Sequence, residues 1–277
     1  TTCRQEPMIK KLQGSLLQAN VEATKLFGYN PDLELVPTQS PHGDVITISA
    51  HGYGANKKTG KNIAKYGSLT GHVLTLNLPD HDFKGDSSHT LTHGTVAELL
   101  PYVYALKTAL TAGAQHINVY GFSAGGGVIV NTLGILNSNR FDTELASIGI
   151  TQADKEAMLK ALEQGVILLD VPLKSIEEII ALRGHTPELA FVAQQYKEND
   201  LRPLDTLSRL QGLKLHILLY FENPDDIIFN QDDVVFIERL ERANNLGTTR
   251  VVFGSNGGHT SWHKELWKQY TEFTCPP

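Results

Sequence analysis

The chain has 277 residues, of which 19% are charged, and its formal net charge is −6. This acidic balance excludes the basic field that attracts nucleic-acid phosphates or an anionic membrane, and no apolar run reaches the roughly 18 residues that span a bilayer. A chain of this length can bury a large core, so we expect residues 1–277 to form a single domain.

The two cysteines, Cys3 and Cys275, lie near opposite ends of the sequence. Neither has another cysteine within metal-ligand spacing, so we expect no metal site. A bridge between them would suit an oxidising compartment, whereas two free thiols are ordinary in terminal segments. The sequence begins with Thr1 and not with methionine, which is typical of an exported chain after processing or of a chain whose leader was removed. Localisation therefore stays open between exported and cytoplasmic.

The first hundred residues alternate between helical and strand patterns. Residues 1–30 contain apolar residues at helical spacing, and residues 33–37 alternate like an edge strand that ends at a proline. Residues 44–50 form a β-branched run of the kind buried on both faces of a parallel sheet. Residues 71–78 predict the next strand and residues 95–112 a helix, with Pro101 either near its start or at a kink.

A polar stretch follows the strand over 71–78. Its acidic and imidazole side chains include Asp80, His81, Asp82, His89 and His93. Their spacing matches no metal-binding motif, so we interpret them as a polar loop at the rim of a site.

The second half predicts three further strands, over 165–172, 214–221 and 248–253. Residues 173–206 interrupt this rhythm with short helical patches that mix charged and apolar side chains. A helix is expected from about residue 231 to 245. Another should follow the glycine-rich stretch before His259, with Thr260 or Ser261 as its N-cap.

Residues 116–130 predict a strand, a sharp turn and a helix. Ser123 would stand at the tip of the turn in a strained backbone conformation. Gly121 and Gly125 leave the space that the strand and helix need to approach each other. The sequence Gly121-Phe122-Ser123-Ala124-Gly125 resembles the nucleophile elbow of the α/β-hydrolase superfamily.

This resemblance implies an α/β-hydrolase fold, with a mostly parallel central sheet, helices on both faces and a small lid at about 173–206. It covers most of the chain, from about residue 33 to 270. The superfamily inserts lid segments where residues 173–206 lie. That segment is too short for a separate cap domain and too charged for a lipid-binding surface, so soluble esters should be preferred to emulsified triglyceride.

The resemblance also assigns a catalytic triad. Ser123 would be the nucleophile and His259 the base, and the acid would follow the strand over 214–221. Asp225 fits the position of the acid better than Asp226 does, because apolar residues follow it two and three positions later. The order serine, acid, histidine along the chain is the order of this superfamily.

The oxyanion hole would use two backbone N–H groups, those of Tyr53 and Ala124. Tyr53 belongs to a His51-Gly52-Tyr53 motif after the strand over 44–50. For His51 we expect a structural role, in which its ring braces the loop by hydrogen bonds. Tyr53 could equally be only a wall of the pocket.

These residues predict a serine hydrolase that cleaves carboxylic esters through an acyl-enzyme, without a metal or cofactor. Thioesterase, lipase or acyltransferase chemistry on the same triad is the alternative, as is a non-catalytic member that only binds a ligand. The expected partner is a small-molecule acyl ester and not a nucleic acid. The sequence does not specify the acyl and alcohol groups or the oligomeric state.

Overall fold

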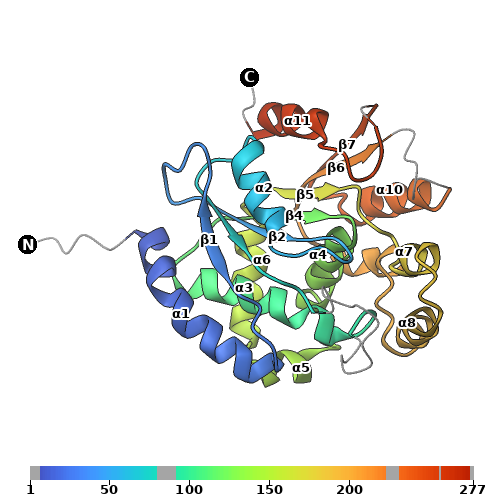
Figure 1. The fold of residues 1–277 in the computed structure, drawn as a ribbon, viewed down its shortest axis with the longest axis horizontal. Helices are drawn as coiled ribbons and strands as arrows, with labels where there is room; N and C mark the ends of the chain where they lie inside the picture. Colours follow the sequence, from blue (N-terminus) through green and yellow to red (C-terminus); the bar gives the residue numbers. More distant parts are fainter. Residues whose placement is uncertain (1–6, 80–91, 223–230, 256, 275–277) are drawn as a thin grey trace, which may run out of the picture.

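A mostly parallel sheet runs through the centre of the molecule (Figure 1). The computed structural model describes residues 7–79, 92–222, 231–255 and 257–274. Within these ranges the sheet has seven strands in the order β1-β3-β2-β4-β5-β6-β7. β1 pairs with β3 antiparallel and the remaining neighbours are parallel. The strands are β1 Glu34–Pro37, β2 Ile46–Ala50, β3 His72–Thr75, β4 Ile117–Phe122, β5 Ile167–Asp170, β6 His216–Glu222 and β7 Thr248–Gly254.

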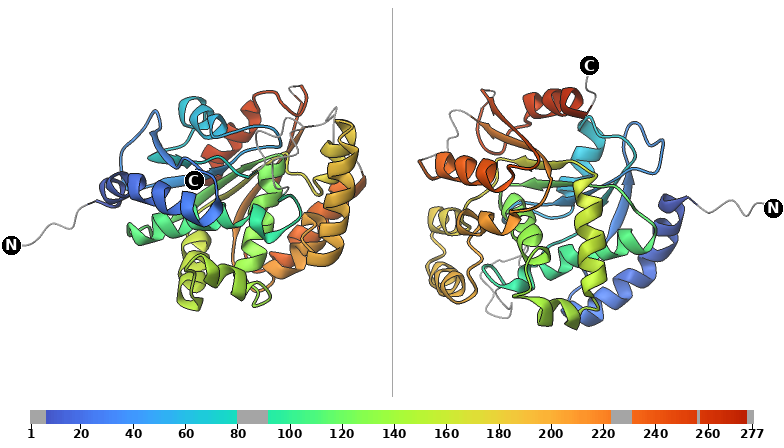
Figure 2. Two further views of the ribbon diagram at one scale, coloured as in Figure 1. Left: turned by 60° about the horizontal axis from the view of Figure 1, so that its bottom comes forward. Right: turned by 180° about the vertical axis from the view of Figure 1, so that it is seen from behind.

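Helices cover both faces of this sheet (Figure 2, left). One face carries α2 Lys58–Tyr66 and α11 Lys264–Thr274. The opposite face carries α1 Met8–Phe27, α3 Leu100–Thr111, α4 Ala124–Leu136, α6 Gln152–Glu163 and α10 Gln231–Ala243. The short helices η1 Val96–Glu98 and α5 Asp142–Ser147 connect these elements. Among the described helices, none is long and apolar enough to cross a bilayer.

The central strands are apolar on both sides because each side packs against a helical layer. In β5, Ile167 and Leu169 enter the core beneath α4 and α6, whereas Leu168 enters the core beneath α2 and α11. All three are at most 1% exposed. This alternation explains why a continuous apolar run, rather than a polar-apolar repeat, predicts a strand here.

The predicted strands and helices are confirmed. At two helix starts the structure resolves one open alternative and corrects one prediction. Pro101 lies in the first turn of α3, where its missing N–H costs no hydrogen bond, so it marks a helix start and not a kink. The last helix begins at Lys264. Thr260 and Ser261 are therefore too early to cap it, and that prediction is wrong.

Residues 173–206 form three helices beside the carboxyl ends of the central strands. They are α7 Glu177–Leu182, α8 Thr186–Asn199 and α9 Pro203–Thr206, followed by η2 Leu207–Leu210. α7 and α8 pack against each other (Figure 1).

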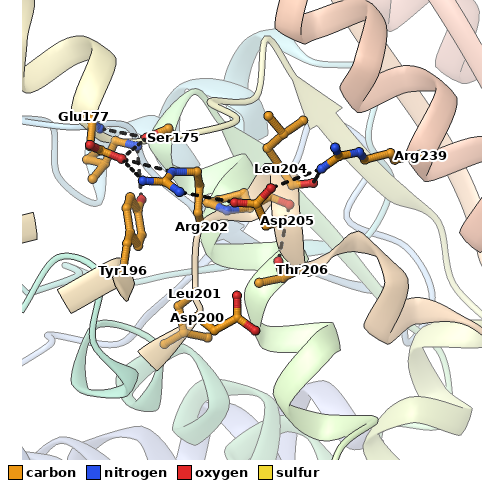
Figure 3. Close-up of polar contacts among 12 residues, drawn as sticks. Ser175, Glu177, Tyr196, Asp200, Leu201, Arg202, Leu204, Asp205, Thr206 and Arg239 are labelled. Carbon is orange, nitrogen blue, oxygen red and sulfur yellow. Dashed lines mark hydrogen bonds and ion pairs between the residues drawn. The ribbon is translucent and has the colours of Figure 1, made fainter. Parts of the chain in front are cut away.

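Arg202 fastens these helices together (Figure 3). Its guanidinium donates to Glu177 Oε1 at 2.5 and 3.0 Å, and lies 5.0 Å from the centre of the Tyr196 ring. A third N–H donates to Asp205 Oδ2 at 3.2 Å, and Asp205 Oδ1 accepts from Arg239 on α10 at 3.1 Å. Arg202 thus links α7, α8 and α9, and Asp205 extends the link to α10.

The close approach of α4 to β2 yields a first prediction. A Cβ on Gly125 would lie 2.1 Å from the carbonyl oxygen of Ala50, whereas a Cβ on Gly134 in the same helix would meet only the Arg209 side chain at 3.4 Å. Gly125→Ala should therefore lower the free energy of unfolding by about 3 kcal/mol or more. Gly134→Ala should be neutral or stabilising by up to about 1 kcal/mol. Urea unfolding of both variants checks this, and equal midpoints would contradict it.

Candidate active site

Ser123 is the single residue between the end of β4 and the start of α4. Its backbone has φ 54° and ψ −118°, a left-handed conformation that is uncommon for a residue with a side chain. The neighbouring strand holds it there, because Ser123 N donates to Asp170 O at 2.9 Å. The carbonyl of Ser123 accepts from Gly126 N at 2.9 Å and from Leu173 N at 3.0 Å. Such strain persists only where the surroundings impose it, and it is concentrated at functional sites.

Two glycines allow the turn to be this tight. A Cβ on Gly121 would lie 2.7 Å from the carbonyl oxygen of Gly125, and Gly125 itself presses on the backbone of Ala50. Strand β4, helix α4 and strand β2 are therefore in backbone contact around Ser123. The geometry has the form of a nucleophile elbow.

His259 faces Ser123 from the loop between β7 and α11. Its Nε2 lies 2.8 Å from Ser123 Oγ, and both residues are only 4% exposed. The Phe122 ring lies 5.5 Å from the His259 ring and supports it from the side of β4. The structure thus brings together two of the three predicted triad residues, which are 136 positions apart in sequence.

The loop after β2 lies against this pair. His51 Nδ1 contacts the carbonyl oxygen of Gly52 at 2.9 Å, and His51 Nε2 accepts from Leu78 N at 2.8 Å. Both ring nitrogens of His51 are thus used to hold the loop. A Cβ on Gly52 would lie 3.1 Å from the Phe122 ring and 3.4 Å from Ser123 Cβ, so the loop passes directly beside the serine.

Tyr53 and Ala124, the two predicted oxyanion residues, line one cavity. Its wall also includes Gly52, Leu78 and Val128. Ala124 is the first residue of α4, where a backbone N–H has no partner within the helix. The cavity therefore adjoins an N–H group that is suited to binding negative charge.

Acidic and imidazole groups lie around the side chain of Tyr53. Its hydroxyl donates to Glu188 Oε2 at 2.8 Å and lies 2.8 Å from His185 Nδ1, both in the 173–206 segment. Glu188 is 1% exposed, and its other oxygen lies 3.6 Å from His93 Nε2. His93 Nδ1 in turn lies 3.0 Å from Glu98 Oε1. His93 was expected on a polar rim, whereas neither glutamate was predicted, because no recognisable motif contains them.

A second cavity also adjoins the N-terminus of α4. Glu98 and Ala124 border both cavities, and Asn131 and Tyr196 border this one. Burial raises the pKa of the Tyr196 hydroxyl, and the nearby charge of Glu98 raises it further. Tyr196 is therefore a neutral hydroxyl at the wall of this cavity.

A second histidine-carboxylate pair lies at the end of β5, the strand next to β4. His263 Nδ1 is 2.6 Å from Asp170 Oδ1, and Tyr120 donates its hydroxyl to Asp170 Oδ2 at 2.5 Å. Burial disfavours charge on His263, but the hydrogen bond and charge of Asp170 outweigh it, so the pKa of His263 is raised. Asp170 was predicted only as part of a strand. A charged residue ending an apolar parallel strand next to the serine strand was the available signal.

Several predicted residues lie outside the described ranges. They are Asp225, Asp226, Cys3, Cys275, Asp80, His81, Asp82 and His89. Within the part of the chain that the structure describes, no group of three or more histidine, cysteine or acidic side chains could hold a metal ion.

Comparison with known proteins identifies the fold. No family model and no curated protein matches the sequence. Among solved structures, esterase B from Lactobacillus rhamnosis, inhibited by a tributyrin phosphonate, is 15% identical, with 98% of this chain and 96% of that chain covered and a TM-score of 0.58. An esterase of Pyrococcus furiosus is 16% identical, with coverages of 90% and 92% and a TM-score of 0.52. A bacterial membrane phospholipase A is 12% identical, with coverages of 96% and 91% and a TM-score of 0.53. The predicted α/β-hydrolase fold is confirmed.

The Tyr53 contacts yield a prediction about stability. Tyr53→Phe removes the hydroxyl that hydrogen-bonds the buried Glu188 carboxylate, and leaves the ring in place. The variant should lose about 1–3 kcal/mol of unfolding free energy, because a buried carboxylate oxygen loses its donor. Tyr66→Phe, at a tyrosine that is 57% exposed, should change it by less than about 0.5 kcal/mol. Denaturant titration of both checks this, and a neutral Tyr53→Phe would show that the hydroxyl does not stabilise the fold.

Proposed function

We propose that this protein is a serine hydrolase that cleaves carboxylic esters through an acyl-enzyme intermediate. The observation that carries the proposal is the 2.8 Å contact between Ser123 Oγ and His259 Nε2, at a serine held in a strained turn. The similarity in fold to an esterase that a tributyrin phosphonate inhibits supports the same chemistry. We therefore assign Ser123 as the nucleophile and His259 as the general base.

In the first step, His259 accepts the hydroxyl proton as Ser123 Oγ attacks the ester carbonyl carbon. The tetrahedral intermediate then collapses, and the alcohol leaves with the proton that His259 returns to it. Water attacks the acyl-enzyme in the second step, again with His259 as base. The acid is released and Ser123 recovers its hydroxyl.

The developing negative charge on the carbonyl oxygen requires hydrogen-bond donors. We assign this role to the N–H groups of Tyr53 and Ala124, because both residues border one cavity and Ala124 directly follows Ser123 in the chain. A donor of this kind is typically worth about 3 kcal/mol of transition-state stabilisation. The contacts of the Tyr53 hydroxyl with Glu188 and His185 would hold the loop that carries one of the two donors.

Asp225 is our candidate for the acid that orients His259. It follows β6, which pairs with β7, and β7 leads to the His259 loop. Asp170, which ends the strand next to that of Ser123, is paired with His263. The assignment to Asp225 therefore rests on its position in the sequence and on the topology of the sheet.

We propose that residues 173–206 act as a small lid. Tyr196 of α8 and Ile176 border the cavity beside Ala124, and Arg202 fixes α7 and α8 to the following turn. A lid anchored in this way favours small soluble esters with short or medium acyl chains over lipid aggregates. The partner is then a small-molecule ester.

The direct test is Ser123→Ala, which removes the nucleophile. The rate on p-nitrophenyl acetate should fall by more than about a thousandfold, with the fold retained. A fluorophosphonate should add to Ser123 of the parent protein, detected by peptide mass, and not to the variant. Ser49→Ala is the matched control, since Ser49 is 1% exposed and its hydroxyl faces Thr75. A parent that neither hydrolyses esters nor accepts the label would instead be a ligand-binding protein.

The acid is tested by a pair of neighbouring variants. Asp225→Asn should lower kcat by about a thousandfold or more, because His259 loses the group that fixes its tautomer and stabilises its charged form. Asp226→Asn should change kcat by less than about tenfold. Steady-state kinetics on the same ester decides between them. The reverse ranking would transfer the role to Asp226.

A further inference from the structure

We propose that His263 is a positioning residue: held by Asp170 in its doubly protonated form, it fixes the loop that carries His259 relative to the turn that carries Ser123. This inference rests on the proposed function, since it assigns His263 a role in aligning the proposed base with the proposed nucleophile. It concerns residues that the triad does not include.

The pair of His263 and Asp170 is buried, and both carboxylate oxygens of Asp170 have a hydrogen-bond partner. His263 is 1% exposed and Asp170 is 3% exposed. One carboxylate oxygen faces His263 Nδ1 at 2.6 Å and the other accepts from the Tyr120 hydroxyl at 2.5 Å. Asp170 therefore has one fixed orientation. Tyr120 of β4 fixes it on one side, and on the other side it is fixed by His263 of the loop between β7 and α11 (the histidine loop).

Asp170 is also bound to the serine turn through its backbone. Phe122 and Asp170 are paired in the sheet, and Ser123 N donates to Asp170 O. The next residue, Val171, has φ 43°, a genuine outlier for a β-branched side chain. Its N–H donates to Tyr220 O at 2.9 Å, so β6 helps to impose this strained turn. The backbone at residues 170–171 is thus fixed relative to the turn that carries Ser123.

His263 connects Asp170 to the backbone of the histidine loop. Its Nε2 lies 3.3 Å from the carbonyl oxygen of Gly258, the residue before His259. The same carbonyl accepts from Ser261 N at 3.1 Å, which closes a tight turn around His259. The Phe122 ring contacts both imidazoles, with centroid distances of 5.5 Å to His259 and 6.4 Å to His263.

The two acceptors require two protons on the ring. Nδ1 faces a carboxylate and Nε2 faces a carbonyl, and only an imidazolium donates from both nitrogens. This geometry also excludes His263 as the base, because neither nitrogen is available to Ser123. A neutral ring would keep the bond to Asp170 and lose its hold on Gly258.

The surroundings favour the charged ring. Facing it are Asp170 from β5, Tyr220 from β6 with its ring centre at 5.0 Å, and Glu222 Oε1 from β6 at 3.8 Å. The Tyr120 hydroxyl of β4 binds the other oxygen of Asp170. Glu265 on α11 adds negative charge near Tyr220. Burial lowers the pKa of His263, yet the two carboxylates and the Gly258 carbonyl raise it above its ordinary value.

The contact between His263 and Gly258 depends on pH. The hold on Gly258 is complete below the ordinary histidine pKa and is lost as the pH rises through the raised pKa of His263. Activity should therefore decline at alkaline pH as His263 loses its proton.

The test compares His263→Asn with the parent from about pH 5 to about pH 10. An Asn amide can still reach Asp170, but it is too short to reach Gly258. We expect kcat per fluorophosphonate-labelled site to fall about ten- to hundredfold, with KM changed less than about twofold and the alkaline decline abolished. His263→Gln, whose amide can occupy the place of Nε2, should recover part of kcat. His116→Asn, at an exposed histidine at the other end of β4, should match the parent.

A second measurement needs no variant and no activity. The side-chain nitrogen resonances of His263, assigned through contact with the Tyr220 ring, should show an imidazolium at neutral pH. Exchange of the Ser261 amide should accelerate at the pH where that ring loses its proton. A neutral His263 at pH 7, or a His263→Asn variant with parental kcat per labelled site and an unchanged pH profile, would overturn the proposal. A parent without esterase activity or labelling would overturn only the proposed function.

Discussion

The constraint on which this site depends is the backbone contact between α4 and the strands β2 and β4. Gly125 has no room for a Cβ against the Ala50 carbonyl, and Gly121 has none against Gly125. Between these glycines Ser123 is forced to a positive φ, and its hydroxyl meets His259. The amino end of α4, where the helix dipole is positive, consequently lies at the same point. A looser contact would displace the serine and the α4 N-terminus together.

Buried carboxylates flank this turn on two sides and stabilise two different loops. On one side Glu188 receives the Tyr53 hydroxyl, which ties the loop after β2 to helix α8. On the other, Asp170 binds Tyr120 and His263, which ties the histidine loop to β4 and β5. Each carboxylate is almost fully buried, so losing a donor is costly and the loops are held in one arrangement. The proposed nucleophile thus sits between loops that are fixed by charge, not only by packing.

The 173–206 segment is part of the same arrangement. Arg202 spans α7, α8 and α9 through Glu177, the Tyr196 ring and Asp205, and Arg239 connects Asp205 to α10. Because Tyr196 also borders the cavity beside Ala124, this cluster fixes one wall of the site. In the proposed hydrolase, the shape of the acyl pocket would therefore be set by ionic contacts remote from the serine.

The sequence by itself determined the strands, most helices and the turn at Ser123, because these follow from local rules. The fold class followed from the resemblance of that turn to a known superfamily. Apolar runs such as Ile167-Leu168-Leu169 are buried on both faces of a parallel sheet, and the glycines around Ser123 are required by its immediate neighbours. Only the tertiary structure decided which polar groups meet. His263 and Asp170 are 93 positions apart, and Tyr53 and Glu188 are 135 apart. Their pairing depends on strand order and on the path of α8 and the histidine loop. No local pattern encodes such contacts, since a buried carboxylate is stabilised by whichever donors the whole fold brings to it.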